Sequence, residues 1–233
     1  MLKKKNLIQK LSGLLATGQI LEESTSEVNP LLEVLSVGDR IMLNGANTNY
    51  SYGGLHRVFQ KVLKKVNIRE RKISEVLILG FGTGSIASIL KEELGINCRI
   101  IGVEKDTEVI RLGEEYFDTG RFNDLEIVEA DAAQYLATLD QKFDLTVVDV
   151  YVDFEVPESC ETDEFVANLD KCLKPVGMVL FNKLVYNHQA GKQADALIHK
   201  FESLKGKTKV IRVRENVVNK VIVYETEDRT TNL

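Results

Sequence analysis

Three glycines spaced two residues apart form the first group whose types and spacing suit chemistry. Gly80, Gly82 and Gly84 lie in the stretch LILGFGTGSIASIL, where an apolar run gives way to a helix-like pattern. Without side chains, the backbone N–H groups of such a turn and the start of the following helix approach a ligand closely. The spacing alone is weak evidence, because the dinucleotide fingerprint has its third small residue at the position of Ser85 and many glycine turns hold nothing. The turn is therefore either a loop for a nucleotide-like ligand or a purely structural turn.

Two acids further along the chain favour the first of these alternatives. Glu104 ends an apolar run about 20 residues beyond the last glycine, where a carboxylate accepts both hydroxyls of an adenosine ribose. Asp131 follows the next apolar run, where an acid accepts the adenine amino group while the backbone N–H of Ala132 reaches a ring nitrogen. Each acid also has a plainer interpretation, a solvated strand end for Glu104 and a helix N-cap for Asp131. Taken with the glycines, they outline an adenosine site.

The elements that must position these residues follow from the hydrophobic period. Short apolar runs alternate with helical patterns from residue 76 onward, which predicts an α/β fold with a Rossmann-like parallel sheet. The predicted strands are Val76 to Gly80, Arg99 to Glu104, Leu125 to Glu129, Leu145 to Asp149 and Met178 to Asn182. The predicted helices are Ser85 to Leu94, Thr107 to Phe117, Ala132 to Leu139, Asp163 to Cys172 and Gln189 to Leu204, with a turn at Lys174 to Gly177.

The C-terminal end changes character, because Lys207 to Arg214 and Val218 to Glu225 are β-branched and alternating. They predict an antiparallel hairpin that completes the parallel sheet. This order of elements is expected for S-adenosylmethionine-dependent transferases. A nicotinamide-binding sheet more often continues with another parallel crossover.

The N-terminal part is predicted to be a small β-rich extension. MLKKKNLIQKLSGLLATG reads as an amphipathic surface helix, since Gln9 and Lys10 interrupt the apolar stretch that a secretion signal needs. Two short strands, Leu31 to Leu35 and Arg40 to Leu43, flank Val37-Gly38-Asp39, and Asn44-Gly45 is the strongest hairpin dipeptide in the chain. With a helix at Leu55 to Val66, the expected division is residues 1–54 for the extension and 55–233 for the main domain.

Composition limits the partners. The 233 residues carry a formal charge of -5, which favours small ligands over nucleic acid. No apolar run approaches the ~20 residues that cross a bilayer, so we expect no membrane partner. The three cysteines are widely separated and lack a Cys-x-x-Cys pair, and the three histidines are scattered. We therefore expect free thiols in the cytoplasm, and no metal site.

At this point the chain resembles the spermidine synthase-like branch of the class I S-adenosylmethionine-dependent methyltransferase superfamily. The likeness covers roughly Leu31 to Asn182 and rests on collinear stretches: RIMLNGANTN, NYSYGGLHRVF, VEKDTEVIRLGEEYF, VEADAAQYL, FDLTVVDVY and ETDEFVANLDKCLKPVGMVLFN. The resemblance implies a cofactor site that comprises Gly80, Gly82, Thr83, Gly84, Glu104, Lys105, Asp131 and Ala132. It also implies that Asp149 helps to deprotonate the acceptor, that Tyr151 orients it, and that Tyr52 lies in the amine-binding segment. The plainer interpretation of Asp149 is a cap on the next turn.

Several departures from the family pattern bear on the reaction. Aminopropyltransferases have an aspartate in the glycine loop that pairs with the amino group of decarboxylated S-adenosylmethionine, and this chain has Thr83 there. The family's glutamate after its tyrosine is replaced as well, because the chain reads Tyr52-Gly53-Gly54-Leu55 and has no acid between Asn44 and Ile68. Lys105 stands where an apolar residue usually covers adenine, although its stem can still do so.

The sequence therefore favours a transferase that uses S-adenosylmethionine to methylate a small-molecule acceptor. One alternative is a spermidine synthase-type aminopropyltransferase with an altered amine pocket, which would use decarboxylated S-adenosylmethionine. Another alternative is a non-catalytic adenosyl-binding protein. A homodimer through the N-terminal extension is a further expectation, and a nicotinamide-dependent dehydrogenase is the least favoured class.

Overall fold

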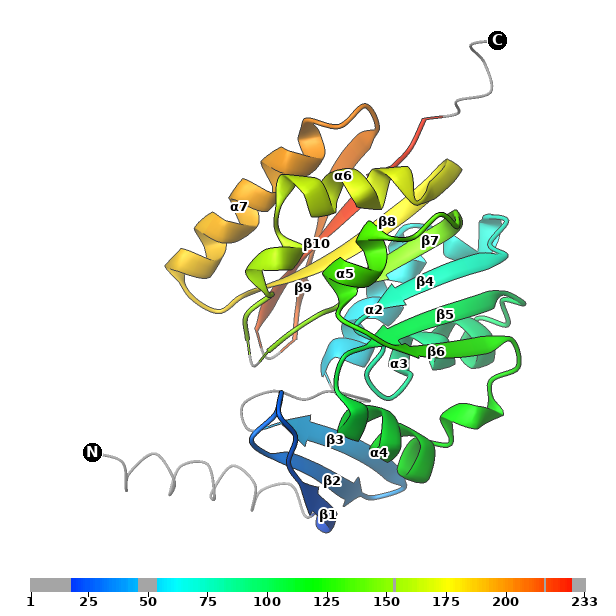
Figure 1. The fold of residues 1–233 in the computed structure, drawn as a ribbon, viewed down its shortest axis with the longest axis vertical. Coiled ribbons are helices and arrows are strands. Elements are labelled where there is room, and N and C mark those ends of the chain that lie inside the picture. Colours follow the sequence, from blue (N-terminus) through cyan, green and yellow to red (C-terminus); the bar gives the residue numbers. More distant parts are fainter. Residues whose placement is uncertain (1–17, 46–53, 153, 216, 228–233) are drawn as a thin grey trace.

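A computed structural model describes residues 18–45, 54–152, 154–215 and 217–227, and its main feature is a seven-stranded sheet (Figure 1). The strand order is β6-β5-β4-β7-β8-β10-β9, in which β6 to β8 are parallel and β10 is antiparallel to both of its neighbours. The strands are β4 (Glu75–Leu79), β5 (Arg99–Glu104), β6 (Leu125–Glu129), β7 (Phe143–Val148), β8 (Leu173–Val185), β9 (Lys207–Arg214) and β10 (Val218–Glu225). The predicted parallel sheet with a C-terminal antiparallel hairpin is confirmed.

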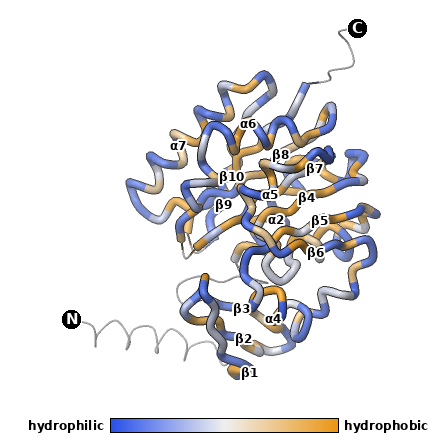
Figure 2. The backbone as a smooth tube through the Cα atoms, viewed as in Figure 1, coloured by the Kyte–Doolittle hydropathy of each residue, from blue (hydrophilic) through white to orange (hydrophobic). Residues whose placement is uncertain are grey.

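Helices cover both faces of this sheet, which explains why its central strands are apolar throughout. α2 (Gly54–Lys65) and α3 (Ser85–Ser88) pack on one face, where Val76 and Ile78 point. α5 (Ala132–Ala137), α6 (Asp163–Lys171) and α7 (His188–Glu202) pack on the other, where Leu77 and Leu79 point. All four of these β4 side chains are fully buried. Figure 2 shows the hydrophobic residues concentrated along the central strands.

Two predicted elements differ locally from the structure. The predicted helix Ser85 to Leu94 begins as α3 but continues as a single π-helical turn, η2 (Ile89–Glu93). The predicted turn at Lys174 to Gly177 is an irregularity inside β8, because the pairing with β7 slips between Phe143 and Leu145 and Val176 adopts a φ of 62°. In both cases an apolar pattern identifies the element but not the local departure from regular geometry.

A second, antiparallel sheet precedes the main one and has the order β1-β2-β3. β1 (Gln19–Ser24) was not predicted, whereas β2 (Leu32–Val37) and β3 (Arg40–Gly45) correspond to the two predicted strands. The turn between them lies at Gly38 and Asp39, since Val37 pairs with Arg40. Asn44 and Gly45 do not form a turn but pair with β2 as part of β3. The predicted N-terminal helix lies outside the described residues.

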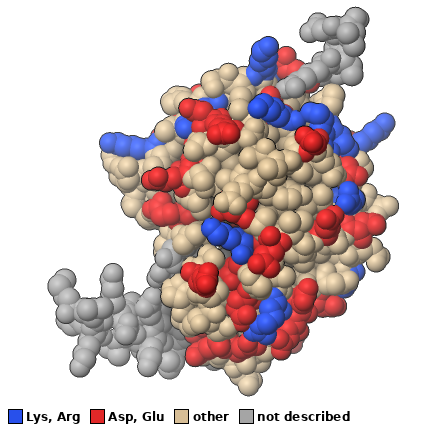
Figure 3. All heavy atoms as spheres, viewed as in Figure 1, with Lys and Arg blue, Asp and Glu red and all other residues tan. Residues whose placement is uncertain are grey.

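The small sheet packs on α4 (Thr107–Phe117), and this contact sets its strand register. Leu32, Val34 and Leu43 are fully buried against the apolar side of α4. An ion-pair network closes the rim of the contact, where Arg111 bonds carboxylates from both sides. Figure 3 shows the acidic side chains gathered over this part of the molecule with basic ones between them. The division at residues 54 and 55 stays a prediction.

Four short helical turns complete the described chain: η1 (Ile68–Glu70), η2, η3 (Thr119–Arg121) and η4 (Glu158–Cys160). Among the described residues, no helix is both long enough and apolar enough to pass through a bilayer.

Candidate active site

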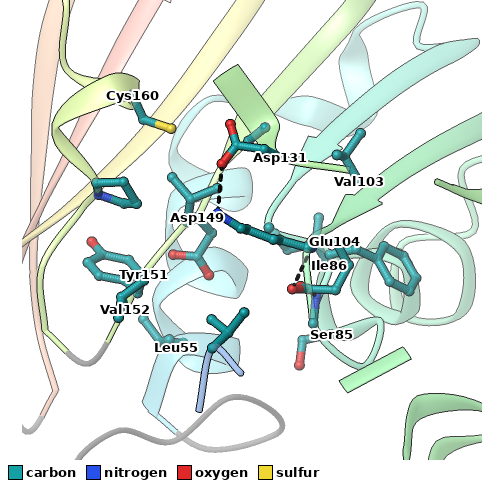
Figure 4. Close-up of a pocket in the computed structure, with 18 of the residues that line it drawn as sticks. Leu55, Ser85, Ile86, Val103, Glu104, Asp131, Asp149, Tyr151, Val152 and Cys160 are labelled. Carbon is teal, nitrogen blue, oxygen red and sulfur yellow. Dashed lines mark hydrogen bonds and ion pairs between the residues drawn. The ribbon is translucent and has the colours of Figure 1, made fainter. Parts of the chain in front are cut away.

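A pocket opens at the carboxyl ends of β4, β5, β6 and β7 (Figure 4). In the sheet, β5 and β6 lie on one side of β4, and β7 and β8 lie on the other. The order in which the chain adds parallel strands therefore switches sides at β4, which leaves a crevice at the carboxyl ends of the strands there. Eight of the residues that line it were candidate site residues in the sequence: Gly80, Gly82, Glu104, Lys105, Asp131, Ala132, Asp149 and Tyr151. The lining consists of Val28, Asn29, Leu55, Phe59, Gly80, Phe81, Gly82, Ser85, Ile86, Val103, Glu104, Lys105, Ala130, Asp131, Ala132, Asp149, Val150, Tyr151, Val152, Pro157, Cys160 and Leu184.

The glycine loop forms one wall of the pocket, and at least one of its glycines is required by packing. Gly80 has a φ of 82°, and a Cβ atom there would lie 2.4 Å from the backbone oxygen of Asp149. Gly82, at a φ of 57°, lines the pocket and donates its N–H to Glu104. The loop is thus a tight turn that presents backbone to the pocket, and ligand binding by this loop stays a prediction.

Thr83 and Gly84 belong to the loop but do not line the pocket. The Thr83 residue is fully buried beside Gly113 of α4, and Gly84 precedes α3 at a φ of 90°. The structure therefore gives these two residues no contact with the pocket, and their part in cofactor binding stays a prediction.

Glu104 ends β5 with its carboxylate held by three backbone N–H groups. Oε2 accepts from Gly82 at 2.9 Å, and Oε1 accepts from Lys105 at 2.9 Å and from Asp106 at 3.1 Å. Burial raises the pKa of the Glu104 carboxyl above its ordinary value, against these hydrogen bonds, which lower it. The carboxylate is rigidly placed and retains acceptor capacity toward the pocket. That is what binding a pair of sugar hydroxyls requires.

Asp131 caps a helix, as its plainer interpretation predicted, and also lines the pocket, while its contact with adenine stays a prediction. Its Oδ1 caps α5 by accepting from the N–H groups of Ala133 at 3.0 Å and Gln134 at 3.3 Å. Its Oδ2 accepts from the Lys105 ammonium at 3.2 Å, and all three of Lys105, Asp131 and Ala132 line the pocket. Partial burial disfavours the ionised form, but the bonds from Gln134 and Lys105 outweigh it and lower the pKa of Asp131. The acid is thus a helix cap that also faces the pocket.

Asp149 follows β7 on the other side of the pocket from Glu104. Its Oδ1 accepts a hydrogen bond from the Asn182 amide nitrogen at 2.9 Å, and its backbone N–H bonds to Leu79. Burial raises the pKa of Asp149 to about 6, and the hydrogen bond from Asn182 offsets only part of this effect. A carboxylate with a pKa close to neutrality and an open face toward a pocket is suited to accept a proton. Among the described residues, no backbone N–H of the turn after β7 donates to the Asp149 carboxylate, so the plainer interpretation as a cap on that turn finds no support there.

Tyr151 lines the pocket with its hydroxyl already engaged. The hydroxyl donates to the Asn182 carbonyl at 2.8 Å and accepts from the Leu184 N–H at 3.0 Å. It thereby pairs with β8 just beyond the end of β7, where β8 has no strand neighbour on that side. The hydroxyl is thus committed to β8, and the predicted role of Tyr151 in orienting an acceptor stays a prediction. Tyr52 lies outside the described residues, so its predicted role stays a prediction.

Sequence reasoning did not single out several residues that build this site, among them Val28, Asn29 and Asn182. Val28 and Asn29 enter the pocket wall from the loop between β1 and β2, because the Asn29 amide donates to Asp106 at 2.6 Å. Asn182 is fully buried and holds Asp149 from β8. No local motif marks Asn29 and Asn182, since each bonds a partner more than 30 positions away in the chain.

Comparisons with known proteins agree with this architecture. Residues 76–177 match the family model described as a methyltransferase domain. A probable polyamine aminopropyl transferase of Bifidobacterium longum is 28% identical over 184 residues, which are 75% of this chain and 40% of that protein. A polyamine aminopropyltransferase of Chromobacterium violaceum is 28% identical over 108 residues, 46% of this chain and 41% of that protein. The chain thus spans about 40% of the length of these curated relatives.

Solved structures extend the agreement to the N-terminal sheet. A probable spermidine synthase from Corynebacterium glutamicum superposes with a TM-score of 0.74 at 18% identity, covering 92% of this chain and 84% of that one. Human methyltransferase-like protein 13, in complex with SAH, gives 0.59 at 16% identity, covering 77% and 85%. The fold is that of the class I S-adenosylmethionine-dependent methyltransferases. Within this fold, the chain is similar to spermidine synthase-like proteins.

Proposed function

We propose that the pocket binds S-adenosylmethionine and that the protein transfers its methyl group to a small-molecule acceptor. The observation that carries this proposal is the pair of carboxylates facing each other across one pocket. Glu104 is held by backbone N–H groups where a ribose would bind, and Asp149 has a pKa of about 6 where an acceptor would lose its proton.

The residues present fit an adenosyl group. Glu104 would take the ribose hydroxyls, Asp131 and the Ala132 N–H would take the adenine edge, and Gly80 and Gly82 leave room beside the backbone. S-adenosylmethionine, when bound, supplies a methyl group activated by its sulfonium. Asp149 accepts the proton that the acceptor loses, while Asn182 keeps the carboxylate in one orientation.

Aminopropyl transfer from decarboxylated S-adenosylmethionine is the second candidate, and the names of the curated relatives favour it. Its cationic tail would need a carboxylate beside the glycine loop. Among the described pocket residues the acids are Glu104, Asp131 and Asp149, and none of them belongs to the loop at residues 80–86. This charge distribution supports intact S-adenosylmethionine, whose own carboxylate would be repelled by an added acid.

Calorimetric titration of the purified protein tests the proposal. The ligands are S-adenosylmethionine, its decarboxylated form, S-adenosylhomocysteine, methylthioadenosine and NAD. We expect S-adenosylmethionine and S-adenosylhomocysteine to bind most tightly. Preference for the decarboxylated form, with turnover of putrescine, would establish the second candidate instead. Binding of adenosyl compounds without turnover of any acceptor would favour a non-catalytic protein, and tightest binding of NAD would contradict all three.

Two variants with a matched control assign the carboxylates. Glu104→Ala is expected to weaken S-adenosylmethionine binding at least about tenfold, because hydrogen bonds to a charged group are lost. Glu129→Ala is the control, since Glu129 ends β6 in register with Glu104 but is exposed and does not line the pocket. Asp149→Asn should leave binding nearly unchanged and lower turnover. The reverse pattern would mean that the two roles are interchanged.

The remaining expectations are predictions: a cytoplasmic location, a homodimer and the lack of a nucleic-acid partner. Cys98, Cys160 and Cys172 are free and buried, as a reducing compartment would allow.

A further inference from the structure

The two sides of the pocket differ in polarity. On the β5 and β6 side lie Glu104, Lys105 and Asp131, together with the backbone of the glycine loop. On the β7 and β8 side the lining is carbon-rich. Figure 4 shows Leu55, Tyr151 and Val152 around Asp149, and Val150 and Leu184, from the same two strands and their ends, also line the pocket, as does Phe59, one turn after Leu55 in α2.

The Tyr151 hydroxyl on this carbon-rich side is already bonded within the protein. It donates its proton to the Asn182 carbonyl and accepts from the Leu184 N–H. Asp149 is therefore the one carboxylate that the described residues offer to an acceptor here. Residues 46–53, which precede α2, contain no Asp or Glu in their sequence, and Asp153 lies outside the described residues.

We propose that the acceptor is a compact molecule with a single protic nucleophile on an uncharged, apolar body, and not a diamine or polyamine. This inference rests on the proposed function, because it concerns the acceptor half of the same pocket. The nucleophile meets Asp149, and its apolar body packs on Leu55, Phe59 and the Tyr151 ring. Apart from Asp149, no carboxylate among the described residues lines this side of the pocket, so a second ammonium group would be removed from water against carbon atoms, which is strongly unfavourable.

A pair of amines of equal length tests the proposal directly. Pentan-1-amine and putrescine each have six heavy atoms in a chain and differ only in whether the far end is a methyl or an ammonium group. Each is titrated into protein saturated with S-adenosylhomocysteine, which blocks turnover. We expect pentan-1-amine to bind at least about tenfold more tightly than putrescine.

The outcomes separate this inference from the proposed function. Equal or tighter binding of putrescine overturns the inference, and so does binding of neither amine while S-adenosylhomocysteine binds. Failure of S-adenosylhomocysteine to bind removes the proposed function itself, and the inference with it.

Two variants at Leu55 test whether the lack of charge in the apolar half of the pocket selects the acceptor. Leu55 lies in the first turn of α2, where an acid is compatible with the helix dipole, so Leu55→Glu is expected to fold. It places a carboxylate in the apolar half and should improve putrescine affinity about tenfold relative to pentan-1-amine. Leu55→Gln, which is similar in shape but uncharged, should not change the ratio. An equal response of both variants would show that charge in this half does not select the acceptor.

Discussion

Replacing Asp149 by asparagine should make the protein more stable while it removes the proposed proton acceptor. The pKa of Asp149 is raised by burial from its ordinary 3.8 to about 6. At about 1.4 kcal/mol per pKa unit, ionising this group in the folded protein costs up to about 3 kcal/mol at neutral pH. The Asn182 hydrogen bond survives, because the asparagine side chain still offers an oxygen acceptor. Contact with pocket water reduces the cost of ionising Asp149, so we expect the substitution to raise the unfolding free energy by about 1 to 3 kcal/mol.

The sign of the pH dependence follows from proton counting. Between pH 4 and 6 the folded state holds a proton on Asp149 and the unfolded state does not, so this group's contribution to stability falls as pH rises through the window and is constant above it. The asparagine variant lacks this slope. The difference in unfolding free energy between this variant and the natural protein should therefore be largest at pH 7.5 and should shrink to about 1 kcal/mol or less at pH 4.5.

Urea unfolding of both proteins at the two pH values measures this difference, and the subtraction cancels the titration of the other groups. Asp131→Asn is the control of opposite sign, because the pKa of Asp131 is lowered and its ionised form stabilises the fold. This control substitution should not raise the unfolding free energy at pH 7.5. The reasoning is refuted if Asp149→Asn destabilises the protein, or if its gain is the same at both pH values. Turnover, measured alongside, should fall in the variant, and in the natural protein it should decline below about pH 6 as Asp149 is protonated.

Three further substitutions test the packing around the site. Tyr151→Phe removes a hydroxyl that pairs with two backbone groups of β8 and should lower the unfolding free energy by about 1 to 3 kcal/mol in urea; an unchanged midpoint would contradict these bonds. Gly80→Ala places a Cβ atom 2.4 Å from the Asp149 backbone oxygen at a φ of 82°, so the melting temperature of the variant should fall by several degrees. An unchanged melting temperature would contradict this close contact between the two backbone segments. Lys183→Met removes the ammonium that lies 2.5 Å from the Glu161 carboxylate, so the free energy of unfolding should fall by about 3 kcal/mol. The double variant with Glu161→Gln should recover most of this loss. Strictly additive effects of the two substitutions would refute the pairing.

Much of the site was predictable because its residues stand at the ends of recognisable strands. Glu104, Asp131 and Asp149 each follow an apolar run, and parallel strands bring their carboxyl ends to the same edge of a sheet. The three acids therefore had to meet near the glycine loop once the run lengths and their order were known. The hairpin of β9 and β10 was predictable for a similar reason, since alternation with period two is a local property.

The sequence alone determined the fold class, the glycine turn and the acids that face the pocket, because local periodicity and chain order contain that information. Only the tertiary structure decided how each polar atom is used. It buries Thr83 away from the pocket, commits the Tyr151 hydroxyl to β8, supplies Asn182 to hold Asp149 and brings Asn29 into the pocket wall. These outcomes depend on contacts between segments far apart in the chain, whose relative positions are fixed by packing of whole elements and not by any local pattern.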